Sequence, residues 1–299
     1  MKRPGFFIVG APKCGTTAMN NYLAQHPDIF MAEKELHYFG SDLRMKERIT
    51  QDEYLNKFQN AGDEKLIGEA SVWYLFSKNA AKELKEFSPD SKIIIMLRDP
   101  VEMLHSLHSQ HLFNANEDVK DFEKAISLDT ERRKGNKLPD SLDYLELPLY
   151  RDTAMFAEQV KRYLTIFGKE NVRIILYEEF KENTAKAVNE TIAFLGLKED
   201  SSIKFELINP NKKIRFLKLH RLLKYPSARL KKVIRIVLPV KKLRHELMVL
   251  LFKTTTLETK RKKMDEKLNN ELKISFSDDI KKLGKLINRD LSKWMTKNN

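Results

Sequence analysis

The sequence predicts an α/β protein: a parallel β-sheet flanked by helices, with a C-terminal helical extension. Short, mostly apolar runs over residues 6–9, 92–97 and 172–176 have the length of strands. The run over residues 6–9 contains no polar residue, so it indicates a strand that is covered on both faces. Segments with helical periodicity, such as residues 156–167, lie between the runs. Strands that alternate with helices in this way are typical of a parallel sheet.

The composition favours one large globular domain. The chain has 299 residues, of which 41% are hydrophobic and 32% charged, and we expect a single domain over residues 1–299. Its α/β core covers residues 1–200, and a basic loop with helices covers residues 201–299. No apolar run approaches the ~20 residues of a membrane span, and the first strand lies too close to Met1 for a signal peptide. The single cysteine fits a reducing compartment, so we expect a cytoplasmic protein.

The excess of basic over acidic residues indicates that the protein binds an anionic partner. With 55 basic and 42 acidic residues, the formal net charge is +13. This excess points to an anionic cofactor, glycan, lipid or nucleic acid, and the sign alone does not choose between them. His105, His108 and His111 recur every three residues, but no carboxylate or cysteine is in step with them. The sequence therefore predicts no metal site.

The loop after the first strand has the features of an anion-binding loop. It runs from Gly10 to Gly15, and a segment with helical periodicity begins at Thr16. The N-terminus of a helix presents N–H groups and a positive dipole end to a phosphate. The glycine spacing is that of a nucleotide triphosphatase, but that motif requires a lysine where this chain has Thr16. The lysine of this loop is Lys13, which is better placed for a single 5′-phosphate.

Two stretches carry a family resemblance. Pro12-Lys13-Cys14-Gly15-Thr16-Thr17 resembles the 5′-phosphosulfate loop of sulfotransferases that use 3′-phosphoadenosine 5′-phosphosulfate (PAPS), with Cys14 where that family usually has Ser or Thr. Glu35-Leu36-His37-Tyr38-Phe39 resembles a Glu-x-His-aromatic-Phe stretch of glycosaminoglycan and related sulfotransferases. The resemblance implies a P-loop-type fold in which Glu35 is the catalytic base, His37 lies beside it and Lys13 stabilises the leaving group. Glu33 is the alternative base if the register differs.

Other parts of the chain add to the resemblance. Arg98 ends a strand and Ser106 follows on a helix, as in the 3′-phosphate site of the family. Tyr177 follows the strand over residues 172–176 and resembles a tyrosine that touches the adenosine. The basic loop over residues 209–215 resembles a segment that folds over the 3′-phosphate. Ala70 stands where the glycosaminoglycan enzymes have a lysine. The donor-binding residues implied are Lys13, Cys14, Gly15, Thr16, Thr17, Arg98, Ser106, Tyr177, Lys212, Lys213 and Arg215.

The implied function is transfer of a sulfonyl group from PAPS to an acceptor hydroxyl. We expect a polysaccharide or glycolipid acceptor, with no metal and no nucleic acid. Two alternatives stay open. A P-loop nucleotide kinase or triphosphatase would use Asp99 to bind magnesium, although the motif lysine is missing. A basic membrane-surface protein would use the cationic stretch 229–238 for peripheral contact with the anionic inner membrane surface.

Three further segments have weaker signals. Residues 44–62 are polar, and we expect them to cover the core rather than join it. The charged segment 114–146 predicts a surface region with one helix near residues 122–128, and its Arg132-Arg133-Lys134 run predicts a solvated face. Apolar residues from Leu283 to Trp294 predict a last amphipathic helix.

Overall fold

The computed structural model describes residues 2–139, 142–206, 212–214, 256–258 and 264–296. The chain forms two compact units. The first comprises Met1–Leu104, Tyr150–Ile208 and Asp265–Asn299, and the second comprises His105–Leu149 and Asn209–Met264. The expectation of one domain over the whole chain stays a prediction.

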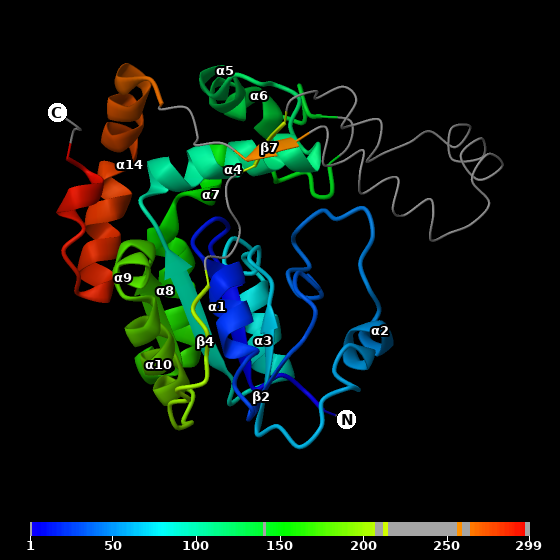
Figure 1. Cartoon of the computed structure of the whole chain (residues 1–299). Coiled ribbons are helices and arrows are strands. Elements are labelled where there is room, and N and C mark those ends of the chain that lie inside the picture. The colour runs from blue at the N-terminus through cyan, green and yellow to red at the C-terminus, as the bar shows by residue number, and fades with distance from the viewer. Residues whose placement is uncertain (1, 140–141, 207–211, 215–255, 259–263, 297–299) are drawn as a thin grey trace. The chain divides into compact units, whose positions relative to one another are not determined.

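The first unit is built on a five-stranded parallel sheet with the strand order β2-β3-β1-β4-β5 (Figure 1). The strands are β1 (Phe6–Gly10), β2 (Ile29–Met31), β3 (Leu66–Ala70), β4 (Lys92–Leu97) and β5 (Val172–Leu176). The central pair, β1 and β4, is the most apolar, and residues 6–9 and 93–97 are fully buried. The predicted α/β fold with a parallel sheet is confirmed.

Helices cover both faces of this sheet. The main ones are α1 (Thr16–Leu23), α3 (Ala80–Phe87), α8 (Phe156–Phe167) and α10 (Thr184–Phe194). The chain moves in opposite directions across the sheet from β1 to β2 and from β3 to β4. Because parallel crossovers are right-handed, α1 and α3 lie on opposite faces. Accordingly, α1 packs with α10, whereas α3 packs with α8.

The first unit also has shorter helices between these elements. They are α2 (Gln51–Asn56), α7 (Tyr150–Thr153), η1 (Lys169–Asn171) and α9 (Tyr177–Glu182). Helix α2 partly corrects the expectation for residues 44–62, because its Tyr54 is fully buried, as is Phe58 just after it. These two side chains therefore join the core, whereas most of the segment is exposed and covers it as expected.

The C-terminal helix α14 (Glu266–Ile287) packs against α8. Its buried Asp279 accepts hydrogen bonds from the backbone N–H of Ala157 at 3.2 and 3.3 Å, and so caps the start of α8. The predicted last helix is confirmed but ends earlier than Trp294. Asn288 adopts a left-handed conformation (φ 53°) that stops the helix, and Trp294 lies in the short helix η2 (Ser292–Trp294).

The boundary between the units falls within α4 (Pro100–Asn114). The second unit also contains α5 (Phe122–Ser127), α6 (Asp129–Arg133) and an antiparallel pair, β6 (Lys212–Ile214) with β7 (Thr256–Glu258). The helix expected near residues 122–128 is confirmed as α5. The solvated face expected for the basic run is wrong for Arg132, whose fully buried guanidinium makes two 2.8 Å hydrogen bonds to the Glu117 carboxylate. This bidentate pair accounts for the burial of both charges.

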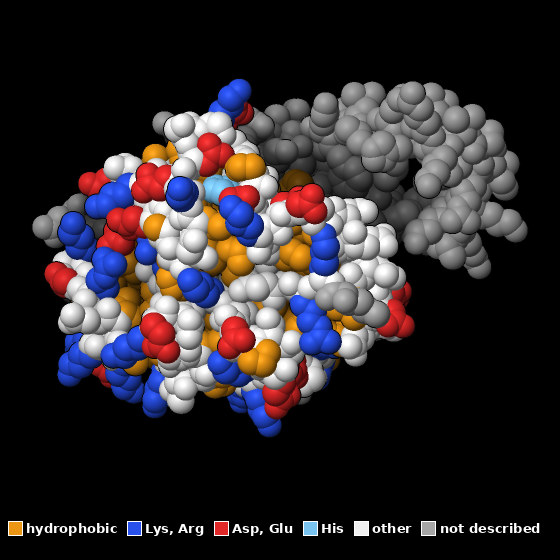
Figure 2. Space-filling model, turned by 90° about the horizontal axis from the view of Figure 1, so that it is seen from below, with side chains coloured by type: hydrophobic (Ala, Val, Ile, Leu, Met, Phe, Trp, Pro, Cys, Tyr) orange, Lys and Arg blue, Asp and Glu red, His pale blue; other side chains and the backbone are white. Residues whose placement is uncertain are grey.

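Among the described residues, no helix has both the length and the hydropathy needed to cross a membrane. Basic and acidic side chains are interspersed on the face of the molecule shown in Figure 2. The cationic stretch 229–238 lies outside the described residues, so its contact with membrane stays a prediction.

Candidate active site

In the loop after β1, Gly15 occupies a position that another residue could not fill easily. Gly15 has a left-handed backbone (φ 91°) immediately before α1. A Cβ on Gly15 would lie 3.2 Å from the side chains of both Tyr177 and Phe180, and 3.3 Å from that of Met96. The backbone N–H of Ala11 donates to the carbonyl of Met96 at 2.6 Å, which fixes the loop to β4. The loop therefore presents the N-terminus of α1 from a closely packed base.

The Cys14 side chain is turned into the protein. It is fully buried, and its Sγ lies 3.4 Å from the carbonyl of Pro12. Burial raises the pKa of this thiol far above its usual value, although the nearby charges of Arg98 and Lys13 act in the opposite direction. The thiol is therefore neutral, and any contact of Cys14 with a bound anion falls to its backbone N–H.

Arg98 and Tyr177 lie together beside this loop. The Arg98 guanidinium stacks over the Tyr177 ring at 4.7 Å from the centroid, and its Nη2 lies 3.2 Å from the Glu102 carboxylate. The Tyr177 ring in turn packs on Gly15. The carboxyl ends of β4 and β5 thus place a guanidinium and an aromatic face next to the start of α1. A planar donor of this kind suits a phosphate.

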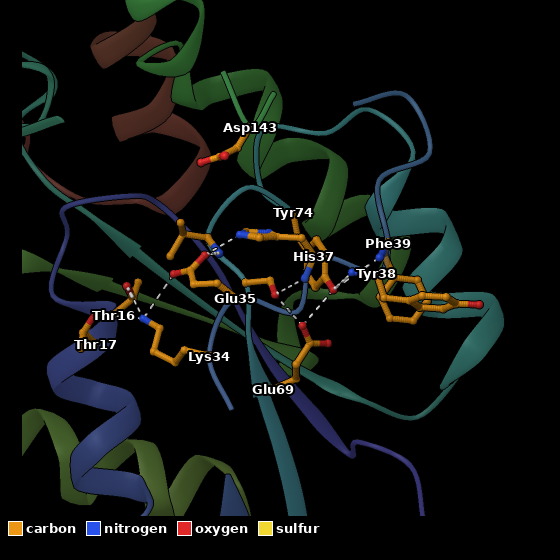
Figure 3. Close-up of polar contacts among 12 residues, drawn as sticks. Thr16, Thr17, Lys34, Glu35, His37, Tyr38, Phe39, Glu69, Tyr74 and Asp143 are labelled. Atoms are coloured by element: carbon orange, nitrogen blue, oxygen red, sulfur yellow. Dashed lines mark hydrogen bonds and ion pairs between the residues drawn. The ribbon is translucent and has the colours of Figure 1, made fainter. Parts of the chain in front are cut away.

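The segment after β2 brings a carboxylate, a histidine and a lysine to the same edge of the sheet (Figure 3). Glu35 Oε2 lies 2.7 Å from His37 Nε2, and Glu35 Oε1 lies 3.6 Å from Lys34 Nζ. Lys34 Nζ also donates to the hydroxyls of Thr17 at 3.0 Å and Thr16 at 3.4 Å. Lys34 therefore links the predicted catalytic carboxylate to the anion-binding loop.

The environment of Glu35 favours its ionised form. Burial opposes ionisation, but the hydrogen bond and charge of His37, the charge of Lys34 and the N–H of Val72 outweigh it and lower the pKa of Glu35. Burial lowers the pKa of Lys34, while its pairing with Glu35 raises it. At neutral pH Glu35 is an anion that can accept a proton. Glu33 points elsewhere: it pairs with Lys57 at 3.0 Å and its side chain is 72% exposed.

The structure brings together most of the residues that the sequence singles out. Lys13 to Thr17, Glu35, His37, Arg98 and Tyr177 all lie in the first unit. Ser106 is buried on α4 but belongs to the second unit, as do Lys212 and Lys213 of β6. Their part in a donor site stays a prediction, and Arg215 lies outside the described residues. In the part of the chain that the structure describes, no cluster of three or more His, Cys, Asp or Glu residues suits a metal ion.

Sequence reasoning missed two residues of this region. Lys34 precedes Glu35 directly, and its position in the same loop was the signal that it would lie near the site. Glu69 is fully buried at the end of β3 and accepts hydrogen bonds from the hydroxyls of Tyr54, Ser71 and Tyr74. Its apolar neighbours in residues 66–74 predict a strand, but no local pattern indicates that a carboxyl group is buried with them.

Comparison with known proteins finds carbohydrate and heparan sulfate sulfotransferases among the relatives of this chain. Carbohydrate sulfotransferase 15 of Mus musculus is 27% identical in an alignment of 246 residues, which covers 65% of this chain and 44% of that protein. Heparan sulfate glucosamine 3-O-sulfotransferase 3B1 of Homo sapiens is 25% identical over 209 residues, covering 70% of this chain and 50% of that protein. The chain thus spans half or less of the length of these relatives.

A solved structure extends the similarity over the whole chain. The sulfotransferase from Alicyclobacillus acidocaldarius is 30% identical, superposes with a TM-score of 0.73, and the match covers 99% of this chain and 100% of that one. The Sulfotransferase domain family matches residues 3–285. The chain that carries this anion loop and its adjoining carboxylate therefore belongs to the sulfotransferase family, whose members are transferases.

Proposed function

We propose that the protein transfers a sulfonyl group from PAPS to a carbohydrate hydroxyl, with Glu35 as the base. One observation carries the proposal. The Lys34 ammonium group contacts the Glu35 carboxylate and the hydroxyls of Thr16 and Thr17, so one side chain connects the carboxylate to the loop. A proton acceptor and an anion-binding loop therefore adjoin each other, as transfer between an anionic donor and a hydroxyl requires.

The residues of the loop fit the two anionic groups of this donor. The N-terminus of α1 and the Thr17 hydroxyl suit the 5′-phosphosulfate. Gly15 keeps the backbone accessible where a Cβ would lie only 3.2–3.3 Å from the side chains around it. Arg98 suits the 3′-phosphate, because its guanidinium is held by Tyr177 and Glu102 and its side chain is only 18% exposed. The Tyr177 ring would then lie near the adenosine.

The proposed chemistry is a single displacement at sulfur. The acceptor oxygen attacks the sulfur atom while Glu35 takes its proton, and the bond between sulfur and the bridging phosphate oxygen breaks. Lys13 neutralises the charge that develops on that oxygen, and Lys34 neutralises charge on the transferred group as it passes toward the acceptor. His37 holds the Glu35 carboxylate through its 2.7 Å contact.

The acceptor class follows from the names of the relatives. Carbohydrate sulfotransferase 15 and the heparan sulfate 3-O-sulfotransferases are named for carbohydrate acceptors. The net charge of +13 agrees with an anionic glycan. We also propose a cytoplasmic location, in keeping with the single cysteine.

Mass spectrometry of the acceptor after incubation tests this function. The protein is incubated with PAPS and heparan sulfate, chondroitin or a neutral glycolipid, and in parallel with ATP and magnesium. We expect one acceptor to gain the mass of a sulfonate, and Lys13→Ala to reduce the product while Lys57→Ala, at an exposed lysine, leaves it unchanged. Phosphorylated product or hydrolysed ATP, without any sulfonated acceptor, would instead support the kinase or triphosphatase alternative.

A further inference from the structure

The loop that carries Glu35 and His37 has an unfavourable backbone. Glu35 has a φ of 65° and His37 a φ of 47°, both in the left-handed region. Side chains with a Cβ seldom adopt this conformation, because the Cβ approaches the following carbonyl oxygen. Surrounding contacts must therefore hold residues 35–39 in place.

The fully buried carboxyl group of Glu69 lies under this loop. Its Oε1 accepts hydrogen bonds from Ser71 Oγ at 2.6 Å and from the Tyr74 hydroxyl at 2.8 Å, while its Oε2 accepts one from the Tyr54 hydroxyl at 2.7 Å. Each of these hydroxyls has one proton, and that proton points to Glu69. The lone pairs of the hydroxyl oxygens are consequently free to face other donors.

The Ser71 and Tyr74 hydroxyls use those lone pairs to bind the loop backbone. Ser71 Oγ accepts the backbone N–H of His37 at 3.0 Å, and the Tyr74 hydroxyl accepts the N–H of Tyr38 at 3.0 Å (Figure 3). By accepting the protons of the two hydroxyls, Glu69 turns their lone pairs toward the loop. The hydroxyls then hold the backbone N–H groups of two consecutive residues, His37 and Tyr38. The Tyr54 hydroxyl donates to the same carboxyl group, on the Oε2 atom that Ser71 and Tyr74 leave to it.

The carbonyl groups of the same loop are held by Arg48. Its Nη1 donates to the carbonyl of Tyr38 at 2.7 Å, and its Nη2 donates to the carbonyl of Gly40 at 2.8 Å. The loop is therefore bound through its N–H groups on one side and through its carbonyl groups on the other. This arrangement explains how a strained backbone keeps one conformation.

We propose that Glu69 is a positioning residue for the transfer reaction, which acts through the Ser71 and Tyr74 hydroxyls to hold Glu35 and His37 at the anion-binding loop. The inference rests on the proposed function, since it assigns Glu69 a part in the same reaction. Within the described residues, the Glu69 carboxyl group bonds to Tyr54, Ser71 and Tyr74, none of which belongs to the anion-binding loop. Loss of this group should therefore alter the rate of transfer and leave donor binding intact.

Four variants test this inference by single-turnover transfer at saturating PAPS and by calorimetry with the desulfonated product, 3′-phosphoadenosine 5′-phosphate (PAP). Ser71→Ala and Tyr74→Phe each remove one link to the loop, and we expect each to lower the transfer rate about tenfold or more, with PAP affinity within twofold of wild type. Tyr54→Phe is the matched control: it removes a hydrogen bond to the same carboxyl group, and we expect less than a threefold effect on the rate. Glu69→Leu removes the acceptor of both hydroxyls, so it should lower the rate about tenfold or more while PAP affinity stays within twofold of wild type.

Amide hydrogen exchange of His37 and Tyr38 separates this inference from the proposed function. If the wild-type protein sulfonates none of the acceptors, the proposed function fails, but exchange still reports on the loop. We expect faster exchange in Ser71→Ala and Tyr74→Phe and unchanged exchange in Tyr54→Phe. Equal effects of all three hydroxyl variants on rate or exchange, no effect of the first two, or a loss of PAP affinity that matches the loss of rate would overturn the proposal.

Discussion

Gly15→Ala is the substitution for which the structure gives the sharpest expectation. The backbone of Gly15 is left-handed, with φ 91°, and an alanine held there loses about 1–2 kcal/mol. The new Cβ would also lie 3.2, 3.2 and 3.3 Å from atoms of Phe180, Tyr177 and Met96, closer than the 3.4–4 Å of ordinary contacts. Forcing such side chains apart costs about 1–3 kcal/mol. The expected loss in the free energy of unfolding is therefore about 2–5 kcal/mol.

Gly196→Ala provides a matched control for this change. Gly196 also has a left-handed backbone (φ 87°), but no described atom lies within 4 Å of a Cβ built on it. This variant should lose only the conformational part, about 1–2 kcal/mol. Urea unfolding of the two variants therefore isolates a packing contribution of about 1–3 kcal/mol at Gly15.

Donor binding should separate the two variants further. In Gly15→Ala the new Cβ displaces the Tyr177 and Met96 side chains, which pack against the anion-binding loop. We therefore expect PAP binding to weaken about tenfold or more in calorimetry, which corresponds to about 1.4 kcal/mol. Gly196→Ala should bind PAP as the wild type does. Equal stabilities and equal PAP affinities for the two variants would show that Gly15 is not a tightly packed residue of a nucleotide-binding site.

Three other predictions concern charged groups near the loop. Arg98→Ala should weaken PAP binding about tenfold or more in calorimetry, because a charge-assisted hydrogen bond contributes about 1.5–3 kcal/mol; an equal loss for a ligand without the 3′-phosphate would refute the assignment. Burial raises the pKa of Asp99 from 3.8 to about 6. The contribution of Asp99 to the free energy of unfolding is therefore largest below pH 3.8 and is lost as the pH rises through 6. Asp99→Asn should therefore stabilise the protein more at pH 8 than at pH 5, by roughly 1 kcal/mol in urea unfolding, and an equal effect at both pH values would contradict this. Lys34→Met should raise the pKa of Glu35, since the lysine charge lowers it, and so move the acid limb of the kcat/KM profile to higher pH; Lys57→Met, at the pair with Glu33, should leave that limb in place.

The sheet and the anion-binding loop could be predicted from local sequence. Residues 92–97 form a mostly apolar run of strand length, and such a run leaves few alternatives. Gly15 follows a strand and precedes a helix, so its neighbourhood alone indicates a tight turn at a helix N-terminus. The same holds for Glu35 and His37, which follow β2 and therefore lie at the carboxyl edge of the sheet.

Buried polar partners could not be predicted in this way. Arg132 lies in a basic run that is typical of solvated surface, and its burial depends on pairing with Glu117, 15 residues away. Glu69 follows the apolar residues of β3, but its burial depends on three hydroxyls, one of them on α2. The polar composition of residues 44–62 likewise hides the core position of Tyr54. Each of these outcomes depends on tertiary contacts that leave no local pattern.

Single-turnover transfer by Glu35→Gln at saturating PAPS tests the central claim most directly. Glutamine keeps the size of the side chain but cannot take the proton of the acceptor, so the rate should fall by roughly 10²–10⁴. PAP affinity should stay within about twofold, because among the described residues Glu35 is linked to the anion-binding loop through Lys34 and not by a direct hydrogen bond. Glu33→Gln, at the exposed neighbouring carboxylate, should transfer at the wild-type rate. A Glu35→Gln rate close to wild type would show that Glu35 is not the base.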